Sequence, residues 1–221
     1  MSQTPYRISF FGGGTDYPLW YEKHGGAVLS TSINKYCYIT CRDLPPFFPF
    51  KHRLVWSQIE LVKELGEIRH PAIRAVLEHL NQEVGLEIHH VGDLPAQSGI
   101  GSSSTFTVGL LNAIFAMRGQ MSSKQELAEL AIHIEQKIIK ETVGSQDQIA
   151  AAFGGFNRVD FTADGKFAVQ PVILPPERLE DRNSKLMLFF TGVSRTAAAV
   201  AQSKVDNFAK KENHLKQMRE M

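Results

Sequence analysis

The most constraining feature of this sequence is a glycine- and serine-rich segment between a β-strand pattern and a strongly apolar helix pattern. It reads Pro95-Ala96-Gln97-Ser98-Gly99-Ile100-Gly101-Ser102-Ser103-Ser104-Thr105. The strand pattern covers residues 86–91, and the apolar run over residues 106–117 is typical of a buried helix. Glycines let the backbone approach a ligand closely, and the free N–H groups at a helix start bind anions. The segment predicts a phosphate-binding loop or, as the plainer alternative, a serine-capped buried helix.

This loop does not match two common nucleotide-binding patterns. A Walker A loop requires a lysine, and the segment has none. A dinucleotide-binding G-x-G-x-x-G loop requires a third glycine where Ser104 stands. It also requires an acidic residue further on, where the chain has Gly119-Gln120-Met121. We therefore predict a phosphate cradle outside both classes.

A second glycine-rich turn, Gly12-Gly13-Gly14-Thr15-Asp16-Tyr17, follows the strand predicted over residues 6–11. The Asp16 carboxylate can accept hydrogen bonds from neighbouring hydroxyls of a sugar, and Tyr17 offers a flat amphipathic face. The alternative is a tight turn in which Asp16 bonds its own backbone. The residues alone leave both interpretations open.

Several charged residues stand in positions that require an explanation. Arg7 lies in an apolar strand, and because arginine is almost never buried unpaired, it predicts a carboxylate or phosphate partner. Glu135 falls at the edge of the apolar stripe of a helix predicted over residues 122–141, whereas Glu141 projects near the middle of that stripe and competes for any role of Glu135. Asp147 begins a helix of small residues, where an N-cap role is the alternative.

Composition excludes several classes of protein. With 24 Lys and Arg against 23 Asp and Glu, the chain lacks the charge excess of a nucleic-acid binder. Cys37 and Cys41 are about 13 Å apart in a strand, too far for a disulfide, so we predict buried apolar side chains. The N-terminus lacks a leader pattern, and no apolar run approaches the roughly 18 residues of a spanning helix. We expect a cytoplasmic protein without a membrane partner.

The order of the predicted elements indicates the α+β class. Strand patterns cover residues 6–11, 26–43, 53–59, 86–91, 156–161, 167–173 and 185–191. Helix patterns cover residues 70–85, 106–117, 122–141 and 146–153, with a final helix from about Arg195. Strands and helices do not alternate with a regular period, which argues against a doubly wound parallel sheet.

In this order, the segments PYRISFFGGGTDYP, LPAQSGIGSSST and IEQKIIKETVGSQDQIAAAFGG resemble the GHMP kinase superfamily of galacto-, homoserine, mevalonate and phosphomevalonate kinases. Within it, GGGTDYP, HGGAVLSTSIN and TGVSR most resemble the D-glycero-D-manno-heptose 7-phosphate kinases. The resemblance implies a GHMP-kinase-like N-terminal domain (ribosomal protein S5 domain 2-like) over residues 1–180 and the start of a ferredoxin-like C-terminal domain over residues 181–221. It implies ATP-dependent phosphorylation of the anomeric hydroxyl of a heptose 7-phosphate, for GDP-heptose and surface-glycan precursor synthesis.

The resemblance also implies roles for individual residues. Nucleotide binding would fall to Pro95, Gly99, Ile100, Gly101, Ser102, Ser103 and Ser104. Substrate binding would fall to Gly13, Gly14, Thr15, Asp16 and Arg195, with Lys35, Arg42 and Lys51 as other candidates for a substrate phosphate. Ser103 and Glu135 would bind Mg²⁺, Asp147 would lie beside the acceptor hydroxyl, and Arg7 would pair with Asp147.

The chain departs from the family pattern near its C-terminal end. No glycine cluster follows Gly192, and residues 200–221 still have a helix pattern. We therefore predict a truncated second domain, and a homodimer formed through its exposed apolar edges. Two alternatives to the heptose assignment stay open. One is a kinase of an unphosphorylated sugar such as galactose or fucose, and the other is a truncated, non-catalytic sugar- or nucleotide-binding module.

Overall fold

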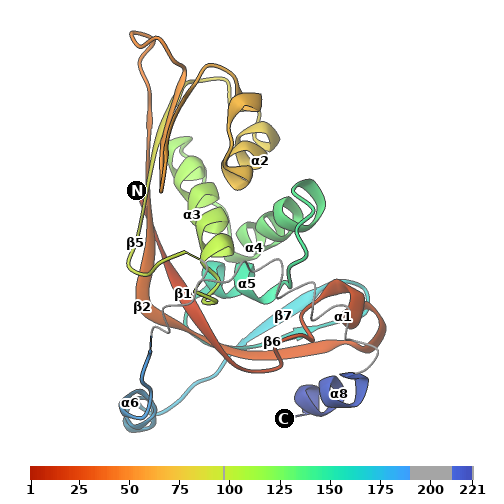
Figure 1. The fold of residues 1–221 in the computed structure, drawn as a ribbon. Coiled ribbons are helices and arrows are strands. Elements are labelled where there is room, and N and C mark those ends of the chain that lie inside the picture. The colour runs from red at the N-terminus through yellow and green to blue at the C-terminus, as the bar shows by residue number, and fades with distance from the viewer. Residues whose placement is uncertain (97, 190–210, 221) are drawn as a thin grey trace.

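The computed structural model describes residues 1–96, 98–189 and 211–220, and its main feature is a seven-stranded sheet with helices α2–α5 gathered on one face (Figure 1). The strands are β1 (Ser2–Phe11), β2 (Gly26–Asp43), β3 (His52–Val55), β4 (Ile59–Val62), β5 (Leu86–Gly92), β6 (Phe156–Phe161) and β7 (Phe167–Pro171). The helices are α1 (Pro18–His24), α2 (Pro71–His79), α3 (Ser102–Met117), α4 (Lys124–His133), α5 (Gln146–Phe153), α6 (Pro176–Ser184) and α8 (Glu212–Glu220). A 3₁₀ turn, η1 (Leu65–Glu67), and a π-helical turn, η2 (Ile134–Ile138), complete the described elements.

Strand β2 forms the centre of the sheet because its 18 residues pair along both edges. One edge of β2 pairs with β1. Along the other edge, residues 37–43 of β2 pair with β5 and residues 26–31 of β2 pair with β6. Among the described strands, only β3 and β5 pair in parallel. The predicted α+β class is confirmed, with a mixed sheet.

Helix α3 fixes the position of the glycine- and serine-rich segment. Most of its residues are buried, as expected of a helix that is apolar on all sides. Leu110 and Leu111 are fully buried in one cluster with Ile39 and Ile88 of the sheet. The N-terminal end of α3 is therefore held beside β1 and β2.

The two cysteines are buried, free thiols on β2. Burial raises the pKa of both Cys37 and Cys41 to about 12, which keeps them protonated and unreactive. The prediction of buried apolar fillers is confirmed.

Several predicted elements have different bounds in the structure. Residues 53–59 do not form one strand, because the Trp56 N–H donates to the Gln58 carbonyl at 2.9 Å and the chain turns between β3 and β4. No glycine or proline marks that turn in the sequence. Helices α1 and α6 were not predicted, although each carries a proline in its first turn, Pro18 and Pro176, where a missing N–H costs nothing.

The C-terminal predictions are covered only in part. Residues 185–189 of the predicted strand over residues 185–191 have no regular secondary structure. The beginning of the predicted final helix lies outside the described residues, whereas α8 falls within its range. The ferredoxin-like domain stays a prediction. None of the helices in the described part of the chain is long and apolar enough to cross a membrane.

We expect acid to destabilise the fold through His70. Its ring accepts the Ile73 N–H at 3.3 Å and stacks on Phe106 at 4.6 Å between ring centroids. Burial, with a smaller effect of the neighbouring His90, lowers the pKa of His70 to about 4, while Glu60 opposes the shift. The folded state therefore favours the neutral ring, and its stabilisation falls as the pH drops from about 6.5 to about 4, by about 2–3 kcal/mol in total.

Urea unfolding of the wild type and of His70→Asn at pH 7.5, 6.0 and 4.5 tests this prediction. Asparagine keeps an N-cap acceptor but does not titrate. The free energy of unfolding of the variant should therefore fall less with acidification than that of the wild type. Parallel curves for the two proteins would contradict the prediction.

Candidate active site

Arg7 contacts the glycine-rich loop directly after a β-bulge in β2, where β2 has extra residues opposite β1. The register of β1 on β2 jumps from Pro5 opposite Tyr36 to Arg7 opposite Ser32. Beyond the jump, the Arg7 N–H donates to the Ile100 carbonyl at 3.2 Å. The Arg7 side chain donates from Nη1 to the Gly99 carbonyl at 3.1 Å. Strand β1 is thus tied to the loop by both the backbone and the side chain of one residue.

Arg7 also pairs with Asp147, which lies 140 residues further along the chain. Arg7 Nε donates to Asp147 Oδ1 at 2.7 Å, and Nη2 lies 2.6 Å from the same oxygen. The carboxylate partner that the sequence predicts for Arg7 is present. The N-cap alternative for Asp147 is wrong, because Ser145 occupies the N-cap position of α5 and Asp147 lies in the first turn. The side chains of Arg7 and Asp147 are 14% and 26% exposed, so solvent reaches the pair.

The loop that begins at Pro95 leads directly into α3, which starts at Ser102. The N-cap residue Gly101 makes no side-chain cap, and no residue of the described chain is recorded as capping this end. The first N–H groups of α3 are thus available to an anion. Among the predicted contact residues, Ile100 and Ser104 are buried, whereas Ser103 is exposed. The plainer alternative, a serine cap, is not what the structure shows.

Gly101 lies against Asp147, so a side chain at this position should disturb the pair. Its φ of +78° favours glycine, and a Cβ there would lie 3.3 Å from Asp147 Cγ and Oδ2. Gly99 has a similar φ of +77°, but a Cβ there would meet nothing within 4 Å. We expect Gly101→Ala to lower the phosphotransferase turnover that the sequence resemblance implies at least 10-fold more than Gly99→Ala, while both lose about 1–2 kcal/mol of stability.

Turnover and thermal unfolding of the two variants, measured side by side, check this prediction. Gly99→Ala is the matched control, because it carries the same backbone strain without the contact to Asp147. Equal turnover in the two variants would contradict the proximity argument.

Glu135 lies in the π-helical turn η2 and is fully buried. Its Oε2 accepts hydrogen bonds from Ser104 Oγ at 2.8 Å and Gln148 Nε2 at 2.6 Å. Its Oε1 has no hydrogen-bond partner among the described residues. Burial raises the pKa of Glu135 to about 7, although neighbouring donors, Ser104 and Gln148 among them, oppose the shift. The site therefore holds a carboxyl with one unused oxygen beside the first turn of α3.

The structure separates Glu135 from its competitor. The predicted helix does not continue to Glu141: η2 ends at Ile138, and Lys140 adopts a φ of +62°. The predicted position of Glu141 near the middle of the apolar stripe is therefore wrong, because a helical wheel assumes α-helical geometry at every residue. The helix also begins later than predicted, at Lys124, with Ser123 as its N-cap.

The Asp16 carboxylate is buried and accepts hydrogen bonds from backbone N–H groups. Oδ1 accepts the Gly14 N–H at 2.9 Å, and Oδ2 accepts the Gln146 N–H at 3.4 Å. The side chain is 1% exposed, and burial raises its pKa. Asp16 thus joins the glycine turn to the start of α5, as the tight-turn interpretation expects. Its predicted contact with a sugar stays a prediction.

Thr15 is engaged in the same turn. Its hydroxyl donates to the Gly12 carbonyl at 2.8 Å and is fully buried. Leu215 of α8 is also buried and lies over Gly14, at 3.2 Å from the position of a Cβ there. The turn is therefore shaped by β1, α5 and α8 together, and Gly13 is its half-buried residue.

The predicted phosphate contacts do not gather at this site. Arg195 lies outside the described residues. Arg42 instead pairs with the buried Glu87 of β5, donating from Nε to Oε2 at 2.6 Å. Lys51 is exposed in the connection from β2 to β3, directly before β3, and Lys35 is exposed on β2. The structure therefore assigns no basic residue to a substrate phosphate.

Three buried or half-buried groups near the site were missed from the sequence. Gln148 contacts Glu135. Trp56 and His70 form an aromatic cluster with Phe106 of α3. The ring centroids of Trp56 and His70 are 4.9 Å apart, and those of His70 and Phe106 are 4.6 Å apart. These residues come from separate elements, so no local pattern identifies them. The local signal for Gln148 is its position next to Asp147 in the QDQ segment of α5.

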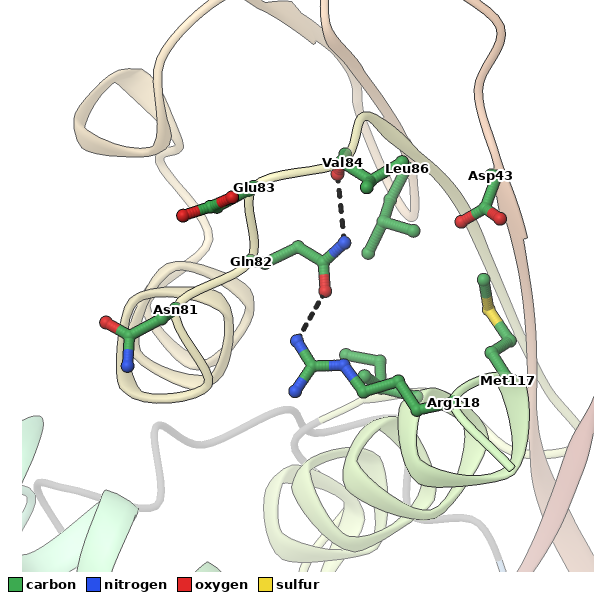
Figure 2. Close-up of a pocket in the computed structure, with 9 residues that line it drawn as sticks. Asp43, Asn81, Gln82, Glu83, Val84, Leu86, Met117 and Arg118 are labelled. Carbon is green, nitrogen blue, oxygen red and sulfur yellow. Dashed lines mark hydrogen bonds between the residues drawn. The ribbon is translucent and has the colours of Figure 1, made fainter. Parts of the chain in front are cut away.

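A separate cavity of about 340 Å³ lies at the opposite end of α3 (Figure 2). Gln82 donates to the Val84 carbonyl at 2.9 Å there and accepts from Arg118 Nη2 at 2.7 Å. Helix α3 has 16 residues, so its two ends are about 24 Å apart. The cavity is distinct from the site at Arg7 and Asp147.

Comparison with known proteins identifies the domain. Residues 61–155 match the family model described as the GHMP kinases N terminal domain. Residues 61–155 form a GHMP kinases N-terminal domain. This GHMP kinase domain includes the glycine- and serine-rich loop, Glu135 and Asp147, whereas Arg7 and Asp16 precede it. The resemblance stated from the sequence motifs is confirmed.

The GHMP kinase domain has relatives among sugar kinases. The D-glycero-alpha-D-manno-heptose 7-phosphate kinase of Campylobacter jejuni is 30% identical over 212 residues, which cover 92% of this chain and 62% of the relative. A galactokinase of Pyrococcus furiosus is 27% identical over 205 residues, which cover 89% and 54%. A solved D-glycero-D-manno-heptose 1-phosphate kinase from Bacteroides thetaiotaomicron superposes with a TM-score of 0.78 at 25% identity, over 99% of this chain and 73% of that one. The chain thus spans less than two thirds of both curated relatives.

Proposed function

We propose that this protein is an ATP-dependent sugar kinase that phosphorylates the anomeric hydroxyl of a heptose 7-phosphate. The observation that carries the proposal is the double attachment of Arg7. Its guanidinium bonds the Gly99 carbonyl of the phosphate loop and the Asp147 carboxylate. One side chain therefore sets the distance between a phosphate-binding loop and an acid that can accept a proton.

This arrangement suits phosphoryl transfer. In that reaction the protein mainly positions the reactants and stabilises the charge on the transferred group. The N–H groups at the start of α3 would bind phosphate oxygens. Asp147 would orient the anomeric hydroxyl and take its proton as the hydroxyl oxygen attacks the γ-phosphorus and ADP leaves. Arg7 would hold the Asp147 carboxylate in place, because its guanidinium donates to Asp147 Oδ1.

The residues near α3 also fit Mg²⁺. Glu135 has an unpartnered buried oxygen, and carboxylate and hydroxyl oxygens are the ligands that Mg²⁺ prefers. Glu135 with Ser103 would hold the ion, as the resemblance implies, and Ser104 is the hydroxyl that contacts Glu135 in the structure. When bound, the ion would neutralise charge on the phosphate oxygens. Among the described residues, no group of three His, Cys, Asp or Glu side chains provides an alternative metal site.

The heptose 7-phosphate acceptor is supported by the motifs and by the named relatives, two of which are heptose phosphate kinases. The turn at Gly13, Gly14, Thr15 and Asp16 would hold the sugar, since Asp16 joins this turn to the helix that carries Asp147. Arg195 would contact the substrate phosphate. The two-domain division at residues 180 and 181 belongs to the same proposal.

A substrate panel tests the function. The chain is incubated with ATP, Mg²⁺ and one of D-glycero-D-manno-heptose 7-phosphate, galactose or fucose, and ADP formation is followed. We expect the heptose 7-phosphate to give the highest kcat/KM. A preference for galactose or fucose would contradict the acceptor assignment. Calorimetric binding of ATP and sugar without turnover of any substrate would contradict the kinase and indicate a non-catalytic binding module.

A further inference from the structure

The first turn of α5 sends three consecutive side chains to three different parts of the site. The Gln146 amide nitrogen lies 3.9 Å from the position of a Cβ at Gly13, in the glycine turn. Asp147 pairs with Arg7. Gln148 points into the interior and is fully buried. Successive residues of a helix are about 100° apart, so one turn can serve all three directions.

Gln148 has one strong contact, and that contact is with Glu135. Its Nε2 donates to Glu135 Oε2 at 2.6 Å. Ser104 Oγ donates to the same oxygen at 2.8 Å. Two donors from different helices, α5 and α3, therefore hold one carboxylate oxygen and leave the other oxygen of Glu135 free of hydrogen bonds among the described residues.

Core packing alone does not explain a glutamine at this position. The Gln148 Oε1 atom is buried and, within the described chain, has no hydrogen-bond partner. An unpaired buried acceptor is costly, and an apolar side chain of similar volume would avoid the cost. The hydrogen bond that Gln148 Nε2 donates to Glu135 is therefore the interaction that can offset the cost of burying this amide.

We propose that Gln148 is a positioning residue that holds the Glu135 carboxylate in the orientation in which its free oxygen can bind a divalent cation. The inference rests on the proposed function. Because Asp147 and Gln148 are neighbours in one helical turn, α5 sets the position of the proton acceptor and of the metal ligand together. Groups that orient metal ligands by hydrogen bonds affect metal affinity by about 10–100-fold.

Nucleotide binding with and without metal tests the proposal. The full chain and its Gln148→Met variant are titrated by calorimetry with adenylyl imidodiphosphate, once with Mg²⁺ and once with a chelator. Methionine has a similar length and fills irregular space, but it cannot donate a hydrogen bond. We expect affinity with Mg²⁺ to fall about 10–100-fold, and affinity without Mg²⁺ to stay within about two-fold. A role in packing alone would weaken both affinities equally.

Gln82→Met is the matched control. Gln82 is another buried glutamine whose amide bonds two groups, at the far end of α3 (Figure 2). Its replacement should leave the effect of Mg²⁺ on nucleotide affinity unchanged. Gln148→Leu is the second variant, because its apolar side chain fills part of the same buried space and has no hydrogen-bond donor. It should lose the Mg²⁺ effect as Gln148→Met does.

The outcomes distinguish this proposal from the proposed function. Wild-type affinity with Mg²⁺ in both Gln148 variants would overturn the positioning role, whatever the substrate panel shows. A selective loss of the Mg²⁺ effect would support it, even if the wild-type chain phosphorylates none of the sugars. A wild-type chain whose nucleotide affinity does not respond to Mg²⁺ would overturn the positioning role as well.

Discussion

Asp147→Asn is expected to lower kcat by about 10²–10⁴-fold. Asparagine keeps the shape of the side chain and an oxygen that can accept from Arg7, but it cannot take up the proton of the acceptor hydroxyl. The Arg7 charge, which faces the Asp147 oxygen at 2.6 Å, then loses its counter-charge in a partly buried site. The loss should appear in kcat more than in nucleotide affinity, because the proposed role of Asp147 is to take a proton from the acceptor and not to bind the nucleotide.

Steady-state kinetics with the preferred sugar, together with calorimetric nucleotide affinity, measure this effect. Asp160→Asn is the matched control: Asp160 also pairs with an arginine, Arg158, at 2.8 Å, but on the exposed face of β6. This control should retain wild-type kcat. Full turnover in Asp147→Asn would remove Asp147 as the proton acceptor.

Glu135→Gln is expected to abolish Mg²⁺-dependent turnover and yet to stabilise the metal-free protein at alkaline pH. Burial raises the pKa of Glu135 from its usual 4.5 to about 7. The folded state therefore favours the protonated carboxyl. No penalty exists below about pH 4.5, the penalty grows as the pH rises from about 4.5 to about 7, and it is complete above that value. Glutamine is neutral at every pH, so it removes the penalty of about 3 kcal/mol at pH 8.

Thermal unfolding in a chelator at pH 4.5 and pH 8 measures this prediction. At pH 8 the melting temperature of Glu135→Gln should exceed that of the wild type by roughly 5–10 °C, and at pH 4.5 the two should agree. Glu129→Gln on the exposed face of α4 is the control and should change neither value. A lower melting temperature at pH 8, or retained Mg²⁺-dependent turnover, would contradict the role of Glu135 as a buried metal ligand.

Local sequence patterns were sufficient to place the glycine- and serine-rich loop before α3 and to give the bounds of α5. Gly99, Gly101 and the serines stand between a strand pattern and an apolar helix pattern, and α3 follows the loop as expected. Helix α5 has the predicted bounds, since small residues favour a helix and Gly154 ends it. In both cases the determining residues lie within a few positions of one another.

The sequence predicted that Arg7 has an anionic partner, but it did not identify Asp147 as that partner. Arg7 in an apolar strand requires an anionic partner, and this requirement is visible in a single residue. Which acid meets it depends on the register shift between β1 and β2 and on the packing of α5 against β1. The chain offers several acids, and only the tertiary structure selects Asp147.

The assignment of Glu135 over Glu141 illustrates a different limit. A helical wheel converts residue number into direction only while the geometry stays α-helical. The π-helical turn η2 interrupts that geometry, and the chain leaves the helix at Lys140. Burial then decides the chemistry, because Glu135 is enclosed by Ser104 and Gln148.

The sequence by itself determined the local features of this protein: a glycine- and serine-rich loop that opens a helix, a glycine turn, an arginine that needs an acid, and a family resemblance carried by three motifs. Only the tertiary structure decided that Arg7 bridges the loop and Asp147, that Asp16 is buried, and that Gln148 holds Glu135. The physical reason is that backbone propensities act over a few residues, whereas burial and hydrogen bonding depend on which distant segments share a sheet edge or a helix face.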